Sequence, residues 1–411
     1  MTTDYYDTLE TRDPETREAE LFAALGDHLR AAMRAPAIAR VLAGVDPDAV
    51  TDREALAALP VMRKSELMAL QADSPPFGGL IPGTIGDYAN VFASPGPIFE
   101  PVPRRVDPFR LARALFAAGV RRGDLVHNTF SYHFTPAGAM LEGGARAVGC
   151  TVFPAGIGQT ELQVQAIARL RPNVYVGTPS FLNILLDKAV EVSADASSIT
   201  KGLVSGEALP PSLRAAIGER GVAVMQCYAT ADVGLIAYES PALEGMILDE
   251  GAIVEIVRPG TGDPVAEGEV GEVVVTPLNP DYPLVRFATG DLSAVMPGPS
   301  PCGRTNTRIR GWMGRADQTT KVRGMFVHPS QVAEVVRRHA EIVRARLVVN
   351  SVDNQDVMTL RCESETDDAG IAGAVAASVR DVCKLRGEIE FVPPGTLAND
   401  GKVIEDARTY E

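Results

Sequence analysis

The sequence predicts an α/β protein with a large N-terminal domain of parallel or mixed sheets and helices, a β subdomain, and a small α+β C-terminal domain. Short apolar runs alternate with helix-like stretches from about residue 110 to residue 228, which is typical of a largely parallel sheet covered on both faces. Residues 250–296 instead show short β runs between Gly, Asp and Pro turns, which indicates the β subdomain. The rest of the chain has the size of an independent domain. We therefore expect domains of residues 1–316 and 317–411.

Local patterns predict the individual elements. Leu21, Leu25 and Leu29 at a spacing of four predict a helix over residues 15–43, and Thr51 followed by Glu54 has the form of a capping box. In the large domain we expect helices at 109–119, 137–148 and 160–170, and strands at 124–129, 150–154, 173–177, 201–206, 222–228, 252–257 and 271–276. In the small domain we expect helices at 329–339 and 369–384, and strands at 344–350, 357–362 and 388–393.

Charge and composition exclude several classes of function. The net charge of −14 argues against nucleic acid or an anionic membrane as a partner, because both attract basic surfaces. The sequence has no apolar run long enough to cross a membrane, and its polar, acidic N-terminus does not have the form of a secretory signal. The five cysteines are widely spaced and include no C-x-x-C, so we expect reduced thiols, a cytoplasmic location and no zinc site.

Three stretches in the large domain carry side chains suited to ligand binding. The loop from Tyr132 to Thr135 could line a pocket, although aromatic side chains more often pack in a core. Ser205–Glu207 and Gln226–Asp232 follow apolar strands, and ligands of open α/β sheets gather beyond the carboxyl ends of the strands. A tyrosine there can stack on a flat ring, and an acid can hold Mg²⁺ beside phosphate. Two ordinary turns after these strands would show the same sequence pattern.

Two further stretches are charged. Asp291 in a tight turn would suit a ribose diol, and Arg315 nearby would suit an anion or a second ribose contact. Lys402 follows a turn near the C-terminus. Charged turns are usually solvated surface, so these residues indicate a site only if the fold brings them to one.

Taken in order, these motifs resemble those of the phenylacetate–coenzyme A ligases, a family within the superfamily of acyl-CoA synthetases, luciferases and peptide-synthetase adenylation domains. The likeness runs from about residue 55 to the C-terminus. The segments that carry it are Tyr132–Thr135, Gly158–Glu161, Gly177–Ser180, Ser205–Glu207, Arg286–Asp291, Pro301–Arg304, Gly314–Asp317 and Gly401–Lys402.

The resemblance implies an AMP-forming carboxylic acid–CoA ligase. Such enzymes join a carboxylic acid to the α-phosphate of ATP and release pyrophosphate. They then rotate the small, mobile domain about a hinge, here Asp317, and the thiol of coenzyme A displaces AMP. ATP/AMP, Mg²⁺ and coenzyme A are the implied cofactors, and a small aryl or apolar carboxylic acid is the implied substrate. Family members are often dimers, so a homodimer is compatible with the resemblance.

The same resemblance implies roles for single residues. Tyr228 would stack on adenine, Asp232 would be a catalytic acid that binds Mg²⁺, and Asp291 would hold the ribose beside Arg315. Lys402 would be the mobile catalytic lysine that stabilises charge in the first half-reaction. The cofactor-binding positions are Ser205, Gly206, Glu207, Gln226, Cys227, Tyr228, Ala229, Thr230, Asp291, Arg315, Lys321 and Gly324. The acyl pocket would be lined by Tyr132, His133, Phe134, Thr135 and Ala208.

The segment aligned with the phosphate loop departs from the family pattern. The family has a Ser/Thr/Gly-rich loop ending in Lys-Pro that cradles the β- and γ-phosphates, and the aligned segment here is Phe92–Pro101. Pro95 and Pro97 each remove an amide donor, and Glu100 stands where the lysine would be. A carboxylate there would repel polyphosphate. The alternative interpretation is therefore a protein on the same scaffold that binds AMP, an acyl-adenylate or an acyl-CoA without cleaving ATP.

Overall fold

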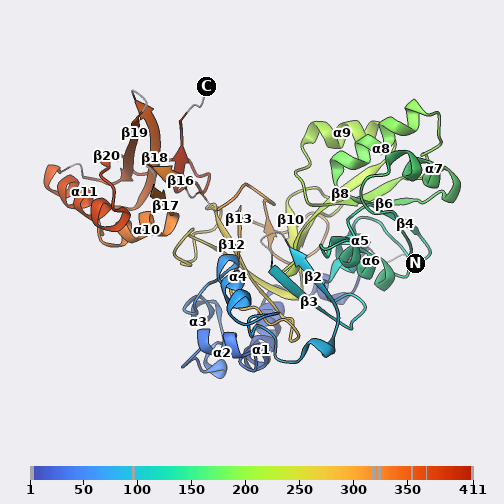
Figure 1. Cartoon of the computed structure of the whole chain (residues 1–411), viewed down its shortest axis with the longest axis horizontal. Coiled ribbons are helices and arrows are strands. Elements are labelled where there is room, and N and C mark those ends of the chain that lie inside the picture. The colour runs from blue at the N-terminus through green and yellow to red at the C-terminus, as the bar shows by residue number, and fades with distance from the viewer. Residues whose placement is uncertain are drawn as a thin grey trace. The chain divides into compact units, whose positions relative to one another are not determined.

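The computed structural model describes residues 4–94, 98–316, 318, 320–322, 325–352, 355–366 and 368–408 (Figure 1). The chain forms two compact units. The first comprises Met1–Val254, Val274–Thr289 and Met296–Trp312, and the second comprises Glu255–Val273, Gly290–Val295 and Met313–Glu411. The domain boundary expected between residues 316 and 317 stays a prediction.

A large mixed sheet with the strand order β14-β15-β10-β9-β8-β7-β6-β4-β5 organises the first unit. Its parallel part consists of β4 (Leu125–Asn128), β5 (Thr151–Pro154), β6 (Val174–Gly177), β7 (Lys201–Val204) and β8 (Ala223–Thr230). The sheet continues through β9 (Gly234–Tyr238), β10 (Met246–Leu248), β14 (Val295–Met296) and β15 (Arg308–Ile309), and β9 pairs antiparallel with β8. The predicted α/β fold class is confirmed.

Alternate residues of the parallel strands face opposite layers of helices. Val176 and Leu203 pack in a cluster with side chains from α5 (Leu111–Ala117) and α6 (Ala137–Val148). Tyr175 and Val204, each next to one of these in sequence, pack in another cluster with α7 (Thr160–Leu170), α8 (Pro179–Glu191) and α9 (Pro211–Glu219). The period of two along a strand therefore covers both faces, which is why these strands appear in the sequence as continuous apolar runs.

The N-terminal helices differ from the prediction. One helix was expected over residues 15–43, but the structure has α1 (Pro14–Ala32) and α2 (Pro36–Val41). Pro36 disfavours helical geometry at Ala35, whose φ of −83° and ψ of 118° lie in the extended region. The cap of α3 (Arg53–Ala57) is Asp52, whose side chain accepts the amide of Ala55, and not Thr51.

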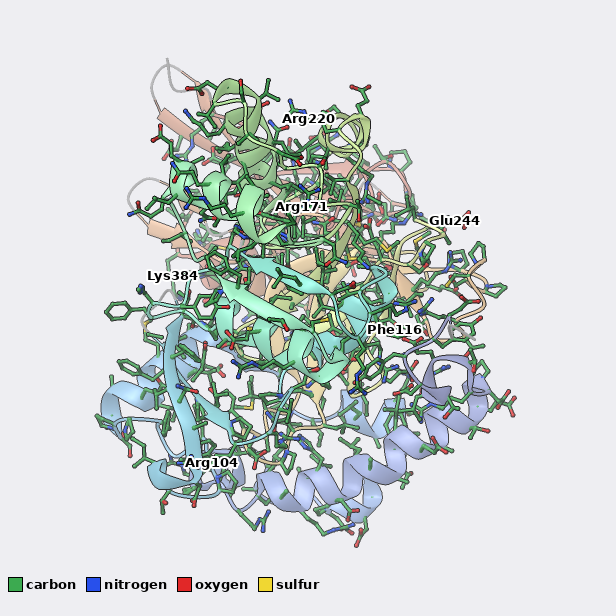
Figure 2. The ribbon with its side chains drawn as sticks, turned by 90° about the vertical axis from the view of Figure 1, so that its right-hand side faces the viewer. Arg104, Phe116, Arg171, Arg220, Glu244 and Lys384 are labelled. Atoms are coloured by element: carbon green, nitrogen blue, oxygen red, sulfur yellow. The ribbon has the colours of Figure 1, made fainter. Side chains whose placement is uncertain are left out.

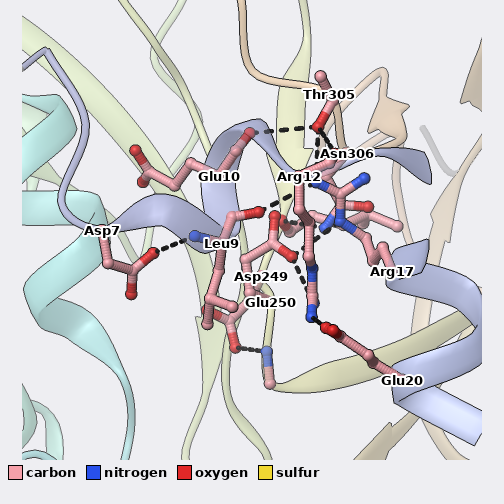
Figure 3. A network of polar contacts seen from close by, with 12 residues as sticks. Asp7, Leu9, Glu10, Arg12, Arg17, Glu20, Asp249, Glu250, Thr305 and Asn306 are labelled. Carbon is pink, nitrogen blue, oxygen red and sulfur yellow. Dashed lines mark hydrogen bonds and ion pairs between the residues drawn. The ribbon is translucent and has the colours of Figure 1, made fainter.

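The N-terminal segment of the first unit is held by buried ion pairs (Figure 3). Glu250, with a side chain 2% exposed, accepts Arg17 Nε at 2.8 Å and Arg12 Nη2 at 2.9 Å. Arg17 also donates to Thr305 Oγ1 at 2.7 Å.

Charges on the outside of this unit include Arg171 and Arg220, at the C-terminal ends of α7 and α9 (Figure 2). Three short 3-10 helices complete the N-terminal region: η1 (Thr8–Thr11), η2 (Pro47–Ala49) and η3 (Ile85–Asp87).

Two smaller β structures carry residues that matter for the site. The hairpin of β2 (Tyr88–Ser94) and β3 (Ile98–Pro103) places Phe92 opposite Glu100. A second sheet has the order β1-β13-β12-β11, formed by β1 (Met62–Arg63), β11 (Ala252–Val257), β12 (Gly271–Pro277) and β13 (Phe287–Ser293). Strand β1 runs parallel to β13 with Arg63 opposite Ala288, and α4 (Lys64–Asp73) begins at the next residue.

The C-terminal part of the second unit has its own sheet, with the order β20-β19-β18-β21. Two helices, α10 (Pro329–Arg337) and α11 (Ala369–Cys383), share one apolar cluster with these strands. The strands of this sheet are β18 (Arg344–Val352), β19 (Gln355–Glu363), β20 (Glu388–Val392) and β21 (Ile404–Asp406). Strands β16 (Thr320–Val322) and β17 (Met325–Val327) pair antiparallel with each other in a separate sheet. Among the described residues, no helix combines the length and apolarity that a membrane crossing requires.

Candidate active site

An ion pair between distant segments lies just beyond the end of β8. Asp232 follows this strand with a side chain that is 3% exposed, and Lys64 Nζ donates to its Oδ2 at 2.9 Å. The pairing of β1 with β13 positions Lys64 at the first residue of α4. Sequence reasoning missed Lys64. The position of Lys64 could have indicated the site. A lysine at the positive end of a helix dipole is unfavourable unless an anion lies nearby.

Glu100 belongs to the same cluster. It lies on β3 and is 1% exposed, and burial, followed by the nearby charge of Asp232, raises the pKa of its carboxyl to about 8. Lys64 and Ser94 act in the opposite direction on this pKa. Burial and Asp232 therefore favour the neutral form of this carboxyl, which opposes the negative charge near polyphosphate that the sequence led us to expect. Pro95 and Pro97 lie outside the described residues.

Several buried oxygen atoms of this cluster have no hydrogen bond within the described part of the chain. They are both carboxyl oxygens of Glu100, Oδ1 of Asp232, Oγ of Ser94 and the hydroxyl of Tyr282. Ser94 and Asp232 are near enough to influence the Glu100 pKa, but without the geometry of a hydrogen bond. Burial raises the pKa of Tyr282, and the charges of Asp232 and Glu100 raise it further. Such a group of buried polar atoms is expected where a water, ion or ligand binds.

The side chains of this cluster do not form a complete Mg²⁺ site by themselves. One oxygen of Asp232 is already held by the ammonium of Lys64. Within the described residues, no three His, Cys, Asp or Glu side chains gather in a way that could hold a metal. The assignment of Asp232 to Mg²⁺ stays a prediction.

The predicted nucleotide-binding residues around β7 and β8 do come together. Ser205 Oγ donates to the carbonyl of Cys227 at 2.8 Å, and Gln226 Nε2 donates to the carbonyl of Glu207 at 2.9 Å. Gly206 makes the turn between them with a φ of 80°, a conformation that favours glycine. These bonds hold the loop after β7 against β8, while the side chain of Ala208 is exposed. The parallel pairing of β7 and β8 brings the two segments to the same edge of the sheet.

Tyr228 is part of β8 and is 9% exposed. Its hydroxyl donates to Thr289 Oγ1 on β13 at 3.1 Å. Ala229 and Thr230 complete the strand, and Asp232 follows it. A hydrogen bond therefore fixes the hydroxyl end of the tyrosine that is expected to stack on adenine. Tyr228 and Asp232 both belong to the first unit.

The loop expected to line an acyl pocket has two half-buried side chains, Tyr132 and Thr135, and two exposed ones. The Tyr132 hydroxyl accepts Asn128 Nδ2 at 2.8 Å, and burial raises the pKa of Tyr132. Phe134 is 83% exposed, and His133 is also exposed. Thr135 is half-buried. The pocket role of this loop stays a prediction.

In the second unit, Asp291 and Arg315 meet as expected, although not in a turn. Asp291 lies on β13, and its Oδ1 accepts Arg315 Nη1 at 2.9 Å. Gly290, the residue before Asp291, has a φ of 74° within the strand. A Cβ at Gly290 would come within 2.6 Å of Arg315 Nη2, so glycine is what lets the guanidinium approach.

Lys402 is exposed in the second unit. It borders a cavity of about 150 Å³ that is also lined by Arg258, Arg337 and Arg344. Asn399 lies three residues before Lys402, and its side chain accepts the amide of Val270 at 3.0 Å. This bond anchors the backbone that leads to Lys402. Lys321 lies on β16. Asp317 and Gly324 lie outside the described residues.

Comparisons with known proteins place this arrangement in a class. The AMP-binding enzyme family matches residues 111–277, which include β4 to β9 and the Tyr228–Asp232 segment. The phenylacetate–coenzyme A ligase of Thermus thermophilus is 32% identical over 348 residues, covering 80% of this chain and 77% of that protein. The enzyme of the same name from Pseudomonas putida is 29% identical over 387 residues, covering 87% of this chain and 86% of that protein. The chain belongs to the phenylacetate–coenzyme A ligase family of AMP-binding enzymes.

A solved structure extends the likeness of fold to nearly the whole chain. The open conformation of 2-hydroxyisobutyryl-CoA ligase, in complex with 2-HIB-AMP and CoA, aligns with a TM-score of 0.74 at 24% identity. The alignment covers 96% of this chain and 92% of that one. At this identity the likeness establishes the fold alone.

Proposed function

We propose that the protein is an AMP-forming carboxylic acid–CoA ligase acting on a small aryl or apolar acid, with phenylacetate as the first candidate because the relatives carry that name. Family membership supports the reaction class. The observation that carries the proposal is the edge of the sheet at β7 and β8. There Tyr228 is anchored on Thr289, the loop of Ser205 is bonded to β8, and Asp232 follows within four residues.

The reaction has two displacement steps. The substrate carboxylate attacks the α-phosphorus of ATP and pyrophosphate leaves, giving an acyl-adenylate. The thiol of coenzyme A then attacks the acyl carbon, loses its proton, and AMP leaves. Tyr228 would bind adenine, and Asp291 with Arg315 would bind the ribose. Lys402 would stabilise the charge that develops between the carboxylate and the α-phosphate. Mg²⁺ would arrive with ATP and neutralise phosphate charge.

The two half-reactions can be measured separately. Pyrophosphate release from ATP is followed with phenylacetate and other aryl acids, and thioester formation is followed from synthetic phenylacetyl-adenylate and coenzyme A. Lys402→Ala should lower pyrophosphate release about a hundredfold or more and leave the second step nearly unchanged. Lys384→Ala, another exposed lysine of the same unit, is the matched control. Binding of AMP without pyrophosphate release from any acid would overturn the ligase proposal.

The alternative function is acyl transfer without cleavage of ATP. The replacement of the loop lysine by Glu100, together with Pro95 and Pro97, favours this alternative. It is supported if wild-type protein forms thioester from phenylacetyl-adenylate and coenzyme A but releases no pyrophosphate from ATP. Pyrophosphate release dependent on an added acid contradicts it.

A further inference from the structure

The cluster beyond β8 has an internal source of positive charge. Asp232 has a side chain 3% exposed, and Lys64 Nζ contacts its Oδ2 at 2.9 Å. The Lys64 side chain is 36% exposed, so it reaches both the buried acid and the solvent. An ammonium has three donors, and the contact with Asp232 uses one of them. Lys64 can therefore remain paired with Asp232 while it binds a second anion.

The segment aligned with the phosphate loop does not supply this charge. Its lysine position holds Glu100, which is 1% exposed on β3 and faces Asp232, Lys64, Ser94 and Tyr282. A neutral acid at this position can donate or accept a hydrogen bond but supplies no positive charge to phosphate. Its burial next to Asp232 favours the neutral form, which removes the repulsion that an ionised carboxylate would exert.

The helix that begins at Lys64 adds to the same field. The first turn of α4 carries the positive end of the helix dipole. A lysine at this end is unfavourable by itself and becomes favourable when anions lie in front of it. Asp232 is one such anion, and the buried oxygens of Ser94 and Tyr282, which have no hydrogen bond within the described residues, lie in the same cluster as further donors.

We propose that Lys64 is the phosphate-binding cation of this site, replacing from helix α4 the loop lysine whose position Glu100 occupies. Its ligand is the β- and γ-phosphate portion of a nucleoside triphosphate, and Asp232 positions the ammonium for it. This inference rests on the proposed function for the identity of the ligand. It assigns no step to a metal ion.

The comparison of ATP with AMP tests the inference directly, because AMP lacks the phosphates that Lys64 would bind. Calorimetric titration of Lys64→Met should show ATP binding weakened roughly tenfold or more and AMP binding changed less than about twofold. Lys64→Arg should recover most of the ATP affinity. Lys188→Met, on α8 of the same unit and paired with Glu191, is the control and should match wild type. Equal changes for ATP and AMP, or no change, would overturn the inference.

A double variant separates phosphate binding from simple neutralisation of Asp232. If Lys64 only balances that buried carboxylate, Lys64→Met/Asp232→Asn should bind ATP as tightly as Asp232→Asn alone, which would overturn the inference. If Lys64 binds phosphate, the double variant should stay at least about tenfold weaker for ATP than Asp232→Asn. Failure of the proposed function looks different: ATP binding would depend on Lys64, but wild-type protein would release no pyrophosphate.

Discussion

Replacing Glu100 by glutamine tests whether this carboxyl is neutral in the folded protein. Burial, followed by the charge of Asp232, raises its pKa from 4.5 to about 8. Between these pH values the folded protein holds a proton that the unfolded chain has released. The stability from this group is therefore fully present below about pH 4.5 and is lost as the pH rises through about 8.

The size of the effect follows from the width of that interval. Each pH unit inside it costs about 1.4 kcal/mol of unfolding free energy. Between pH 6 and pH 8 the wild type should lose about 2 kcal/mol through this group, because the slope flattens as the folded carboxyl begins to ionise. Glutamine has a similar shape and no charge to gain, so Glu100→Gln should lack this part of the pH dependence.

Urea unfolding followed by far-UV circular dichroism at pH 6, 7 and 8 measures the difference between the two proteins. Contributions from other titrating groups are common to both and cancel in the difference. Glu219→Gln, an exposed glutamate at the end of α9, should behave as wild type. A constant offset between Glu100→Gln and wild type would report the packing of the amide. Equal losses between pH 6 and pH 8 would refute the neutral carboxyl.

Three further predictions concern buried and ribose-site residues. Arg286 is 1% exposed and its guanidinium donates to two backbone carbonyls, so Arg286→Met should lower the unfolding free energy by roughly 2–4 kcal/mol in urea titrations. Burial lowers the pKa of His28 from 6.5 to about 4, so the stability it contributes is lost as the pH falls from 6.5 to about 4, and His28→Gln should lack that slope in thermal unfolding. Arg315→Ala should cost less than about 1 kcal/mol, because the side chain is 56% exposed, yet weaken AMP binding roughly tenfold in calorimetric titration by releasing Asp291.

Elements with a strong local pattern were predictable from the sequence. The helix expected at 137–148 is α6 with the same bounds, and the strand expected at 173–177 corresponds to β6, Val174–Gly177. In each case the spacing of apolar residues and a glycine at the C-terminal end locate the ends of the element to within a few residues. The parallel order of these strands follows from the same alternation, because each helix returns the chain to the same edge of the sheet.

Elements that depend on distant partners were not predictable in this way. Strand β1 has two residues and exists because Met62 and Arg63 pair with β13, more than two hundred residues later in the chain. The β2–β3 hairpin lies in a segment rich in proline, and its buried Glu100 breaks the apolar pattern that would mark a strand. Asp291 was expected in a tight turn, yet strand β13 continues through Gly290 and Asp291.

The same limit applies to the phosphate end of the site, where the prediction from sequence rests on one loop. An alignment compares charge position by position, so Glu100 counts as a lost cation and a gained anion. In the folded chain the relevant quantity is the charge of the cluster, to which Asp232 contributes one negative charge, Lys64 one positive charge, and a buried Glu100 close to none at neutral pH. A cation supplied by another element can serve the same phosphates, provided that its contact with Asp232 persists when ATP binds. If Lys64 binds the phosphates as proposed, cleavage of ATP should depend more on Lys64 than on the residue at position 100.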